Sequence, residues 1–384
     1  MDLEKTKLAF YSNQLNHHQV YLADEFYRIL GDRYVFVAVS PQNIEDQKGG
    51  GIYGRPYLCI TGENEEQRQK AVRIAQEAEI CVFGACSQQY AIMRAKHNPK
   101  GLSFEVAERW LKRGWLNILS PNLIKWWMNY QLHYRKANFY KLCSSAFVKE
   151  DDEKLCAYKG RHYKWGYFPE AKPYAGAPEE DMRTKMPQSL RILWCARFLE
   201  LKHPEVMVLL AEKLMRTGVD FHIDMIGDGD TLEKIKQLAH SKGVANYITF
   251  VGALPNSEVI REMYLHDVFV MSSDKHEGWG VVVNEAMLNE CCVIASDQVG
   301  CTPYLIRDGE NGMLFSLKDE NSLYNKVMYA LSSPDRIREM AAEGKKTIIE
   351  LWNPGIAAVA LLKLAECLQQ DRNDAISQGP CSKA

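Results

Sequence analysis

Short apolar runs alternate with helix-spaced apolar positions along most of the chain. In the first half, the runs KLAFYSN (residues 7–13) and YVFVAVS (34–40) flank HHQVYLADEFYRIL (17–30), whose apolar residues recur at helical spacing. This order predicts a βαβ unit. Two further helices and one further strand are predicted by EEQRQKAVRIAQEA (65–78), FEVAERWLKRG (104–114) and EICVFGA (79–85). The alternation is typical of a parallel, doubly wound α/β sheet.

The alternation stops at a polar stretch and then begins again. EAKPYAGAPEEDMRTKMPQS (170–189) holds three prolines and many charges, a composition typical of a linker. Strands and helices then follow one another from LRILWCA (190–196) to CCVIASD (291–297). The last apolar stretch, residues 348–370, predicts helix with a break at Pro354. The second half is therefore expected to be another α/β domain.

A chain of 384 residues is too long for one ordinary core, which also favours two domains. We predict an N-terminal Rossmann-like domain (1–165), a linker (166–189), a C-terminal Rossmann-like domain (190–350), a helix that packs back across the domains (351–372) and a mobile tail (373–384). Ligands of such sheets bind at the carboxyl ends of the strands, so we expect the site in a cleft between the domains.

Composition narrows the class of protein. The chain is 46% hydrophobic and 25% charged, and its net charge of −2 gives no overall attraction to nucleic acid or anionic membranes. The first residues lack the apolar core of a signal peptide, and no stretch approaches eighteen consecutive apolar residues. Eleven cysteines without paired CxxC spacing favour a reduced, cytoplasmic chain without disulfides or a zinc site.

Three segments of the second half carry residues suited to an anionic ligand. CARFLELKHPE (195–205) supplies Arg197 and Lys202, and IGDGD (226–230) supplies Gly227 and Gly229. HEGWGVVVNEAM (276–287) then places two glutamates eight positions apart, the second inside an apolar run. A carboxylate rarely lies in an apolar run unless something polar meets it.

These segments resemble the family 4 glycosyltransferases of the GT-B fold. The shared pattern is a strand followed by R-x(4)-K, a strand followed by GxG, and then the E-G-x-G-x(4)-E-A element with a trailing DGENG turn. The resemblance covers residues 190–330 well and the first domain only in architecture. It departs from the family at His203, where a glycine usually follows the lysine. It implies two Rossmann-like domains with parallel sheets that face an interdomain cleft.

The physical chemistry of a nucleotide-sugar donor agrees with the resemblance. Fixed cations stabilise a diphosphate as it leaves, and Arg197 and Lys202 would supply them. Gly278 and Gly280 would let the backbone approach the phosphates just before a helix. Glu285 could accept hydrogen bonds from ribose hydroxyls, as acidic residues do in dinucleotide sites.

The resemblance assigns the remaining donor contacts. Glu277 is placed at the hydroxyls of the transferred sugar, Trp279 in the wall of the sugar pocket, and Gly227 and Gly229 at the donor. It implies a retaining transferase that needs no metal or other cofactor. The sequence DGD at 228–230 imitates a metal-binding motif, but it lies in a glycine turn between a strand and a helix.

Other interpretations of the same residues stay open. The charged residues could belong to an ordinary surface, the glycine pair could make only a tight turn, and the two glutamates could be a glycosidase pair. Glycosidases, however, need neither the cation pair nor the glycine loops. The remaining candidates are another GT-B-like enzyme, such as a phosphorylase or a nucleotide-sugar epimerase, and a non-catalytic protein that binds sugar nucleotides.

The first domain offers candidates for the acceptor side. Asn16, His17 and His18 lie in the loop after the first strand, where a neutral imidazole could hydrogen-bond an acceptor hydroxyl. The alternative is that one histidine caps the helix and the other is solvated. GACSQQ (84–89) follows another strand and is a second candidate loop.

Residues 109–149 hold eight Lys or Arg and no Asp or Glu, with aromatic residues between them. Such a segment suits the headgroup layer of an anionic membrane, and a membrane-bound acceptor such as a lipid-linked glycan would explain it. The alternative is that most of these aromatics are core residues and that the cations are scattered over the surface. Nucleic acid is not expected as a partner. We therefore predict a cytoplasmic glycosyltransferase, peripheral on the inner face of the membrane, that uses a nucleotide-sugar and a glycan or lipid-linked acceptor in cell-surface glycan synthesis.

Overall fold

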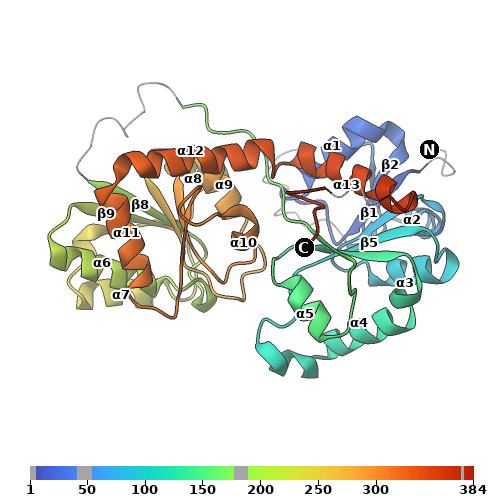
Figure 1. The fold of residues 1–384 in the computed structure, drawn as a ribbon, viewed down its shortest axis with the longest axis horizontal. Helices are drawn as coiled ribbons and strands as arrows, with labels where there is room; N and C mark the ends of the chain where they lie inside the picture. Colours follow the sequence, from blue (N-terminus) through green and yellow to red (C-terminus); the bar gives the residue numbers. More distant parts are fainter. Residues whose placement is uncertain (1–5, 41–53, 177–188, 373–375) are drawn as a thin grey trace. The chain divides into compact units, whose positions relative to one another are not determined.

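A computed structural model describes residues 6–40, 54–176, 189–372 and 376–384. The chain divides into two compact units. The N-terminal unit consists of Met1–Glu170 together with Trp352–Ala384, and the C-terminal unit consists of Ala171–Leu351. Each unit is a Rossmann-like α/β domain, and each is described by itself below (Figure 1).

The N-terminal unit is built on a sheet of seven parallel strands in the order β3-β2-β1-β4-β5-β6-β7. The strands are β1 (Leu8–Ser12), β2 (Tyr34–Ala38), β3 (Leu58–Ile60), β4 (Ile80–Phe83), β5 (Leu102–Ala107), β6 (Phe139–Cys143) and β7 (His162–Lys164). The strand order reverses between β1 and β4, which pair directly, Leu8 with Ile80. Loops at such a switch point are where doubly wound sheets bind ligands.

Helices cover both faces of this sheet. On one face, α1 (Val20–Leu30) packs against α13 (Pro354–Gln369), so a segment from the far end of the chain completes the N-terminal unit (Figure 1). On the other face, α2 (Glu65–Glu77) packs against α3 (Gln88–His97). The unit also holds α4 (Pro121–Leu132), α5 (Val148–Lys154) and the 3₁₀ helices η2 (Gly31–Arg33), η4 (Gly114–Leu119) and η5 (Tyr134–Lys136).

The helix predicted over residues 104–114 is wrong. Strand β5 occupies Leu102–Ala107 and pairs on both sides, with β4 and with β6. Leu102 and Phe104 are buried, and Glu105 between Phe104 and Val106 points to the other face. Apolar residues at 104, 107 and 111 also fit helical spacing, so the local pattern was ambiguous and the pairing partners decided it.

The C-terminal unit has six parallel strands in the order β10-β9-β8-β11-β12-β13. They are β8 (Leu190–Cys195), β9 (Phe221–Ile226), β10 (Ile248–Gly252), β11 (Val268–Met271), β12 (Cys292–Ser296) and β13 (Met313–Phe315). Strand β8 pairs with both β9 and β11, so its carboxyl end lies at the switch point of this sheet. The prediction of two α/β domains with parallel sheets is confirmed.

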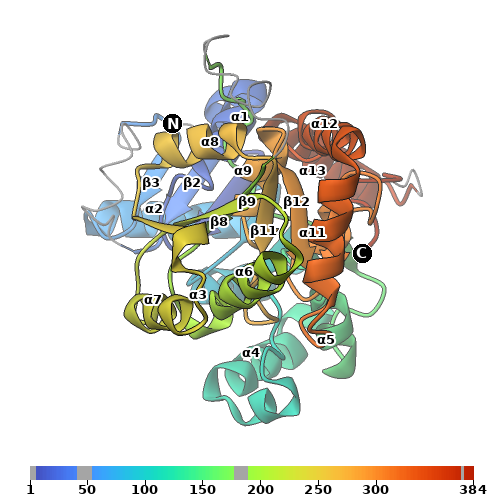
Figure 2. The ribbon, with the colours of Figure 1, turned by 90° about the vertical axis from the view of Figure 1, so that its left-hand side faces the viewer.

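Helices α6 (Glu205–Thr217), α7 (Leu232–Ser241) and α11 (Ser322–Ser332) pack together on one face of the second sheet (Figure 2). Helices α8 (Asn256–Leu265), α9 (Val282–Leu288) and α12 (Pro334–Glu350) form the other layer. The remaining elements are α10 (Thr302–Leu305) and the 3₁₀ helices η8 (Glu200–Lys202) and η9 (Ala245–Tyr247). Of the predicted linker, residues 177–188 lie outside the described residues.

The tail differs from the mobile segment that its polar composition predicted. Cys381 and Ser382 are buried, and the backbone pairs with the edge strand β7: the N–H of Lys164 donates to the Ser382 carbonyl over 2.8 Å, and the N–H of Cys381 donates to the Lys164 carbonyl over 2.7 Å. Strand β7 is the last strand of the sheet, so its outer backbone groups have no strand of the sheet to pair with, and the tail can pair there whatever its side chains.

Among the described residues, no single helix has both the length and the hydropathy to span a membrane, although α12 and α13 reach both when they are taken as a pair, with a bend of 49° between them.

Candidate functional site

The loop after β8 carries the two predicted phosphate cations. Arg197 is exposed, and within the described part of the chain no hydrogen bond or ion pair engages its guanidinium group. Lys202 ends the 3₁₀ helix η8, and its ammonium group forms an ion pair with the carboxylate of Glu277. The structure thus brings Lys202 and Glu277 together from loops that follow two neighbouring strands, β8 and β11.

His203 occupies a backbone position that would suit a glycine. Its backbone has φ +49° and ψ +52°, in the left-handed region that favours glycine and that histidine enters more readily than bulkier residues do. The ring compensates by bridging two carboxylates, with Nδ1 2.8 Å from Glu205 and Nε2 3.3 Å from Asp274. The Glu205 hydrogen bond, with help from Asp274, raises the pKa of His203. The substituted loop is therefore tied to the loop of Glu277.

Gly227 and Gly229 lie against the Arg197 loop. A Cβ on Gly227 would lie 2.0 Å from the carbonyl oxygen of Ala196, and a Cβ on Gly229 would lie 2.6 Å from that of Phe198. Backbone hydrogen bonds fix this approach, because the N–H of Phe198 donates to the Asp228 carbonyl over 2.9 Å. The two glycines therefore set the course of the Arg197 loop, which is more than a tight turn requires.

The turn of Glu277 is a compact structure in which Gly278 is buried. Gly280 has φ +86°, and a Cβ there would lie 2.9 Å from the Val299 side chain. Trp279 between them differs from its predicted place in a sugar pocket. Its side chain is 1% exposed, and its indole N–H donates to Asn284 over 2.9 Å. Trp279 anchors the turn from inside the unit and leaves the ligand contacts to other residues.

Glu285 lies on the seven-residue helix α9 and is largely withdrawn from solvent. This burial raises the pKa of Glu285 to about 7, and a hydrogen bond with the side chain of Asn256 opposes the shift only in part. A carboxyl that loses water without gaining a cation is typical of functional sites, where a ligand supplies the missing donors.

The N-terminal unit contains a pocket of about 730 Å³ at the carboxyl ends of its central strands. Asn16 lines it, whereas His17 and His18 are not among its lining residues. Burial and the neighbouring His17 ring lower the pKa of His18 to about 4, so its imidazole is neutral at neutral pH. Neither histidine caps α1, whose N-cap residue is Gln19. Of the predicted second loop, residues 84–89, all but Gln89 line the pocket.

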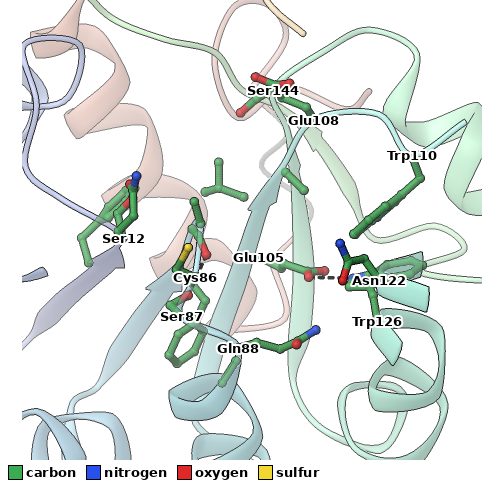
Figure 3. Close-up of a pocket in the computed structure, with 18 of the residues that line it drawn as sticks. Ser12, Cys86, Ser87, Gln88, Glu105, Glu108, Trp110, Asn122, Trp126 and Ser144 are labelled. Carbon is green, nitrogen blue, oxygen red and sulfur yellow. Dashed lines mark hydrogen bonds between the residues drawn. The ribbon is translucent and has the colours of Figure 1, made fainter. Parts of the chain in front are cut away.

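The pocket also holds a carboxylate that the sequence did not identify. Glu105 on β5 lines the pocket, where it accepts a hydrogen bond from the Trp126 indole N–H over 2.7 Å (Figure 3). It accepts another from the Lys141 ammonium over 2.9 Å. Lys141 is completely buried, and Asp152, 3.8 Å away, is its second partner. Burial alone would lower the pKa of Lys141, but the carboxylates of Asp152 and Glu105 raise it.

The basic aromatic segment divides into two kinds of residue. Trp126, Tyr130, Tyr134 and Phe139 are core residues, and Lys141 is a buried ion-pair partner. In contrast, large apolar side chains are exposed along η4 and α4, up to 60% for Trp115 and 75% for Leu116. The exposed apolar residues are Trp115, Leu116, Ile118, Leu119, Ile124, Trp127, Met128 and Leu132, and the exposed cations of the same segment are Arg113, Lys125, Arg135 and Lys136. We call these twelve side chains the η4–α4 surface.

A family model matches most of the C-terminal unit. The model of the family described as Glycosyl transferases group 1 matches residues 181–347. A GDP-mannose-dependent alpha-(1-6)-phosphatidylinositol monomannoside mannosyltransferase of Mycobacterium tuberculosis (strain CDC 1551 / Oshkosh) is 26% identical over 203 residues, 51% of this chain and 52% of that protein. Putative glycosyltransferase EpsD of Bacillus subtilis (strain 168) is 32% identical over 145 residues, 38% of this chain and 36% of that protein. The chain therefore spans about half, or less, of these relatives.

Solved structures resemble the whole chain. Anabaena Alr3699/HepE, crystallised in complex with UDP, has a TM-score of 0.69 and 14% identity, and the match covers 95% of this chain and 100% of that one. Sucrose-phosphate synthase from Thermosynechococcus elongatus has a TM-score of 0.66 and 15% identity over the same shares. At this identity the likeness shows the fold alone. The chain thus has the GT-B fold of two Rossmann-like domains, and its residues 181–347 match the glycosyl transferases group 1 family.

Proposed function

We propose that this protein is a glycosyltransferase that moves a sugar from a nucleotide-sugar donor to an acceptor hydroxyl in cell-surface glycan synthesis. The carrying observation is the Lys202–Glu277 ion pair, formed by two motif loops of the C-terminal unit and placed on the same loop as the exposed Arg197. Related proteins support the donor class, since one is named as GDP-mannose-dependent and a structural neighbour was crystallised with UDP.

We infer the chemistry from the way the donor would replace the Lys202–Glu277 ion pair with its own contacts. In the free protein, Lys202 and Glu277 satisfy each other. When the donor binds, its diphosphate would form an ion pair with the ammonium group of Lys202. The hydroxyls of its sugar would donate hydrogen bonds to the carboxylate of Glu277. Arg197 would then meet the charge that develops on the diphosphate as it leaves, an interaction stronger in the transition state than in the bound donor.

We further propose that transfer retains the anomeric configuration, by front-face substitution in which the leaving phosphate helps to deprotonate the acceptor, and without a metal. The support is the likeness to the retaining family in the spacing of Arg197, Lys202, Glu277 and Glu285. The coupling constant of the anomeric proton of the product, followed from the start of the reaction, reports the configuration. Inversion at that carbon contradicts the proposal.

The activity is tested first by thermal shift with free nucleoside diphosphates and their sugars. A ligand at a hundred times its dissociation constant adds about 2.7 kcal/mol to the free energy of unfolding. A labelled donor then separates the candidates. Release or transfer of the sugar with formation of the nucleoside diphosphate identifies a transferase, whereas binding without turnover identifies a non-catalytic protein. A phosphorylase would instead form a sugar phosphate from inorganic phosphate.

The η4–α4 surface supports a second element of the proposal, a peripheral contact with an anionic membrane. Exposed Trp and Leu side chains can enter the headgroup region, and each nearby cation adds about 1 kcal/mol of attraction to an anionic surface. Lys141, which the sequence placed among these cations, is excluded because it is buried.

Vesicle co-sedimentation tests the membrane contact. Binding to vesicles that contain phosphatidylglycerol should exceed binding to phosphatidylcholine vesicles and should weaken as salt screens the attraction. Replacing Arg113, Lys125, Arg135 and Lys136 with Gln should reduce binding, while Lys326→Gln in the C-terminal unit serves as the charge control. Equal binding of the wild type to both kinds of vesicle contradicts the membrane proposal.

A further inference from the structure

The pocket of the N-terminal unit has a chemistry of its own. We propose that it binds a neutral sugar ring, the terminal residue of the acceptor, with Glu105 as the hydrogen-bond acceptor for its hydroxyls and Trp110 as the wall for its C–H face. The inference rests on the proposed function, because it names the class of acceptor that the glycosyltransferase would use.

Glu105 is held in place before any ligand arrives. Each of its carboxylate oxygens already accepts one hydrogen bond, one from Trp126 and one from Lys141. A carboxylate has about four acceptor sites in all, so sites remain for a ligand. The side chain is still 16% exposed and lines the pocket. The buried Lys141, which is shared with Asp152, offsets part of the cost of keeping the Glu105 carboxylate beside the pocket.

The aromatic wall of the pocket suits a sugar. Trp110 lines the pocket beside Trp126, with ring centroids 5.2 Å apart, and the Trp110 side chain points into the pocket in Figure 3. The indole N–H of Trp110 is buried and has no hydrogen-bond partner among the described residues, so it is available as a donor. A pyranose presents apolar C–H groups on its faces and hydroxyls around its edge, which matches indole faces combined with carboxylate and amide groups. Asn13, Asn122 and Gln88 supply the amides.

The charges of the pocket favour a neutral ligand over a phosphate. Two of its cations are already engaged: Lys112 pairs with Glu108 at 2.9 Å, and Arg109 binds Asp151 through two hydrogen bonds of 3.0 and 3.2 Å. A phosphate would meet the carboxylates of Glu105 and Glu108, and among the described lining residues only the exposed Lys125 offers it a cation outside an ion pair. Hydroxyl groups need no cation, since a carboxylate accepts directly from them.

Cys86 makes the pocket accessible to experiment. Its thiol is exposed and it lines the pocket, whereas Cys156, also exposed and in the same unit, does not line it. The intact protein is treated with iodoacetamide, and the alkylation rates of both cysteines are followed by peptide mass spectrometry. The probes are neutral methyl hexopyranosides, with glycerol 1-phosphate as the anionic comparison.

We expect at least one methyl hexopyranoside to slow alkylation of Cys86 about tenfold at ten times its dissociation constant, because occupied pockets are protected in proportion to occupancy. Cys156 should react at an unchanged rate. Glu105→Gln, which keeps an oxygen for Lys141 or Trp126, and Trp110→Ala should each abolish the protection, while the exposed control Glu153→Gln should retain it. Melting curves establish that each variant is folded, and Trp110→Ala provides the test if Glu105→Gln fails to fold.

Three outcomes overturn the inference: no hexopyranoside protects Cys86, only glycerol 1-phosphate protects it, or both pocket variants fold and keep the protection. Nucleotide binding and donor turnover, measured on the same preparation, separate this failure from failure of the proposed function. If the donor is bound and turned over while no hexopyranoside protects Cys86, only the assignment of the acceptor class is wrong.

Discussion

The two units differ in whether a cation compensates the charge of a partly buried carboxylate. In the N-terminal unit, Glu105 meets the ammonium group of Lys141 and the indole N–H of Trp126. In the C-terminal unit, Glu285 is withdrawn from water and gains a hydrogen bond with Asn256, and its pKa is raised to about 7. The first carboxylate is compensated by the protein itself. The second is left uncompensated, and we interpret this as a place kept for the hydroxyls of a ligand.

Removing the compensating charge in the N-terminal unit should have the largest effect. Lys141→Met leaves Asp152 and Glu105 without their shared cation, and breaking a buried pair in this way costs about 3–5 kcal/mol of stability. Denaturant unfolding followed by tryptophan fluorescence measures it, with the exposed Lys125→Met as the control. A loss below about 1 kcal/mol would mean that the carboxylates of the N-terminal unit need no compensation, and the contrast with Glu285 would disappear.

Arg197→Ala should lower turnover about 10²-fold at saturating donor, because it removes a cation that meets charge developing on the leaving group. Stability should change little, since Arg197 is exposed and makes no contact that the fold requires. Arg216→Ala, an exposed arginine on α6, is the matched control. Turnover close to that of the wild type would remove Arg197 from the donor site.

The two glutamates of HEGWGVVVNEAM should separate nucleotide from sugar. Glu285→Gln should weaken binding of the free nucleoside diphosphate by about 1.5–3 kcal/mol, because its proposed partners are ribose hydroxyls present in donor and product alike. Glu277→Gln should spare the free nucleotide and damage transfer. Calorimetry with the nucleoside diphosphate and turnover with the donor distinguish the two. Equal loss of nucleotide affinity in both variants contradicts the assignment.

Glu285→Gln should weaken nucleotide binding, but in the ligand-free protein the same change should increase the free energy of unfolding. The folded state keeps the Glu285 proton up to pH about 7, whereas the unfolded chain, with the ordinary value of 4.5, has released it. Stability therefore falls as the pH rises from about 4.5 to about 7 and is level above that range. The stability of the variant should not fall over this pH range, and at pH 8 its free energy of unfolding should exceed that of the wild type by about 1–3 kcal/mol. Thermal melts across this range measure it, and Glu258→Gln on α8 is the control.

The candidate residues of the C-terminal site could be named from the sequence because each lies in a short motif that follows a strand, although Lys202 and Glu277 are 75 positions apart. The glycines, Arg197, Lys202 and Glu277 all lie in loops whose order and spacing carry the pattern. Trp279 was misplaced because the same spacing allows a side chain to face the ligand or the interior, and only its hydrogen bond to Asn284 shows which.

The N-terminal pocket could not be predicted in the same way. Glu105 was assigned to a helix, and its partners Trp126 and Lys141 come from a helix and a strand more than twenty residues further along the chain. Burial of Lys141 depends on β5 and α5 together, and no local pattern encodes such a neighbour. The loop at residues 84–88 was found because loops after strands are predictable even where their side-chain contacts are not.

The packing of α13 on α1 has a consequence for how the protein matures on the ribosome. Helix α1 ends at Leu30 and α13 ends at Gln369, so 339 residues separate the two surfaces that must meet. At a translation rate of about 5–20 residues per second, α13 is synthesised roughly 17–70 s after α1, and until then it cannot pack on the apolar face of α1. The C-terminal unit, continuous from Ala171 to Leu351, can fold within that interval. The N-terminal unit is thus translated first and completed last. Its apolar α1 face is therefore the surface that chaperones have most reason to protect during synthesis.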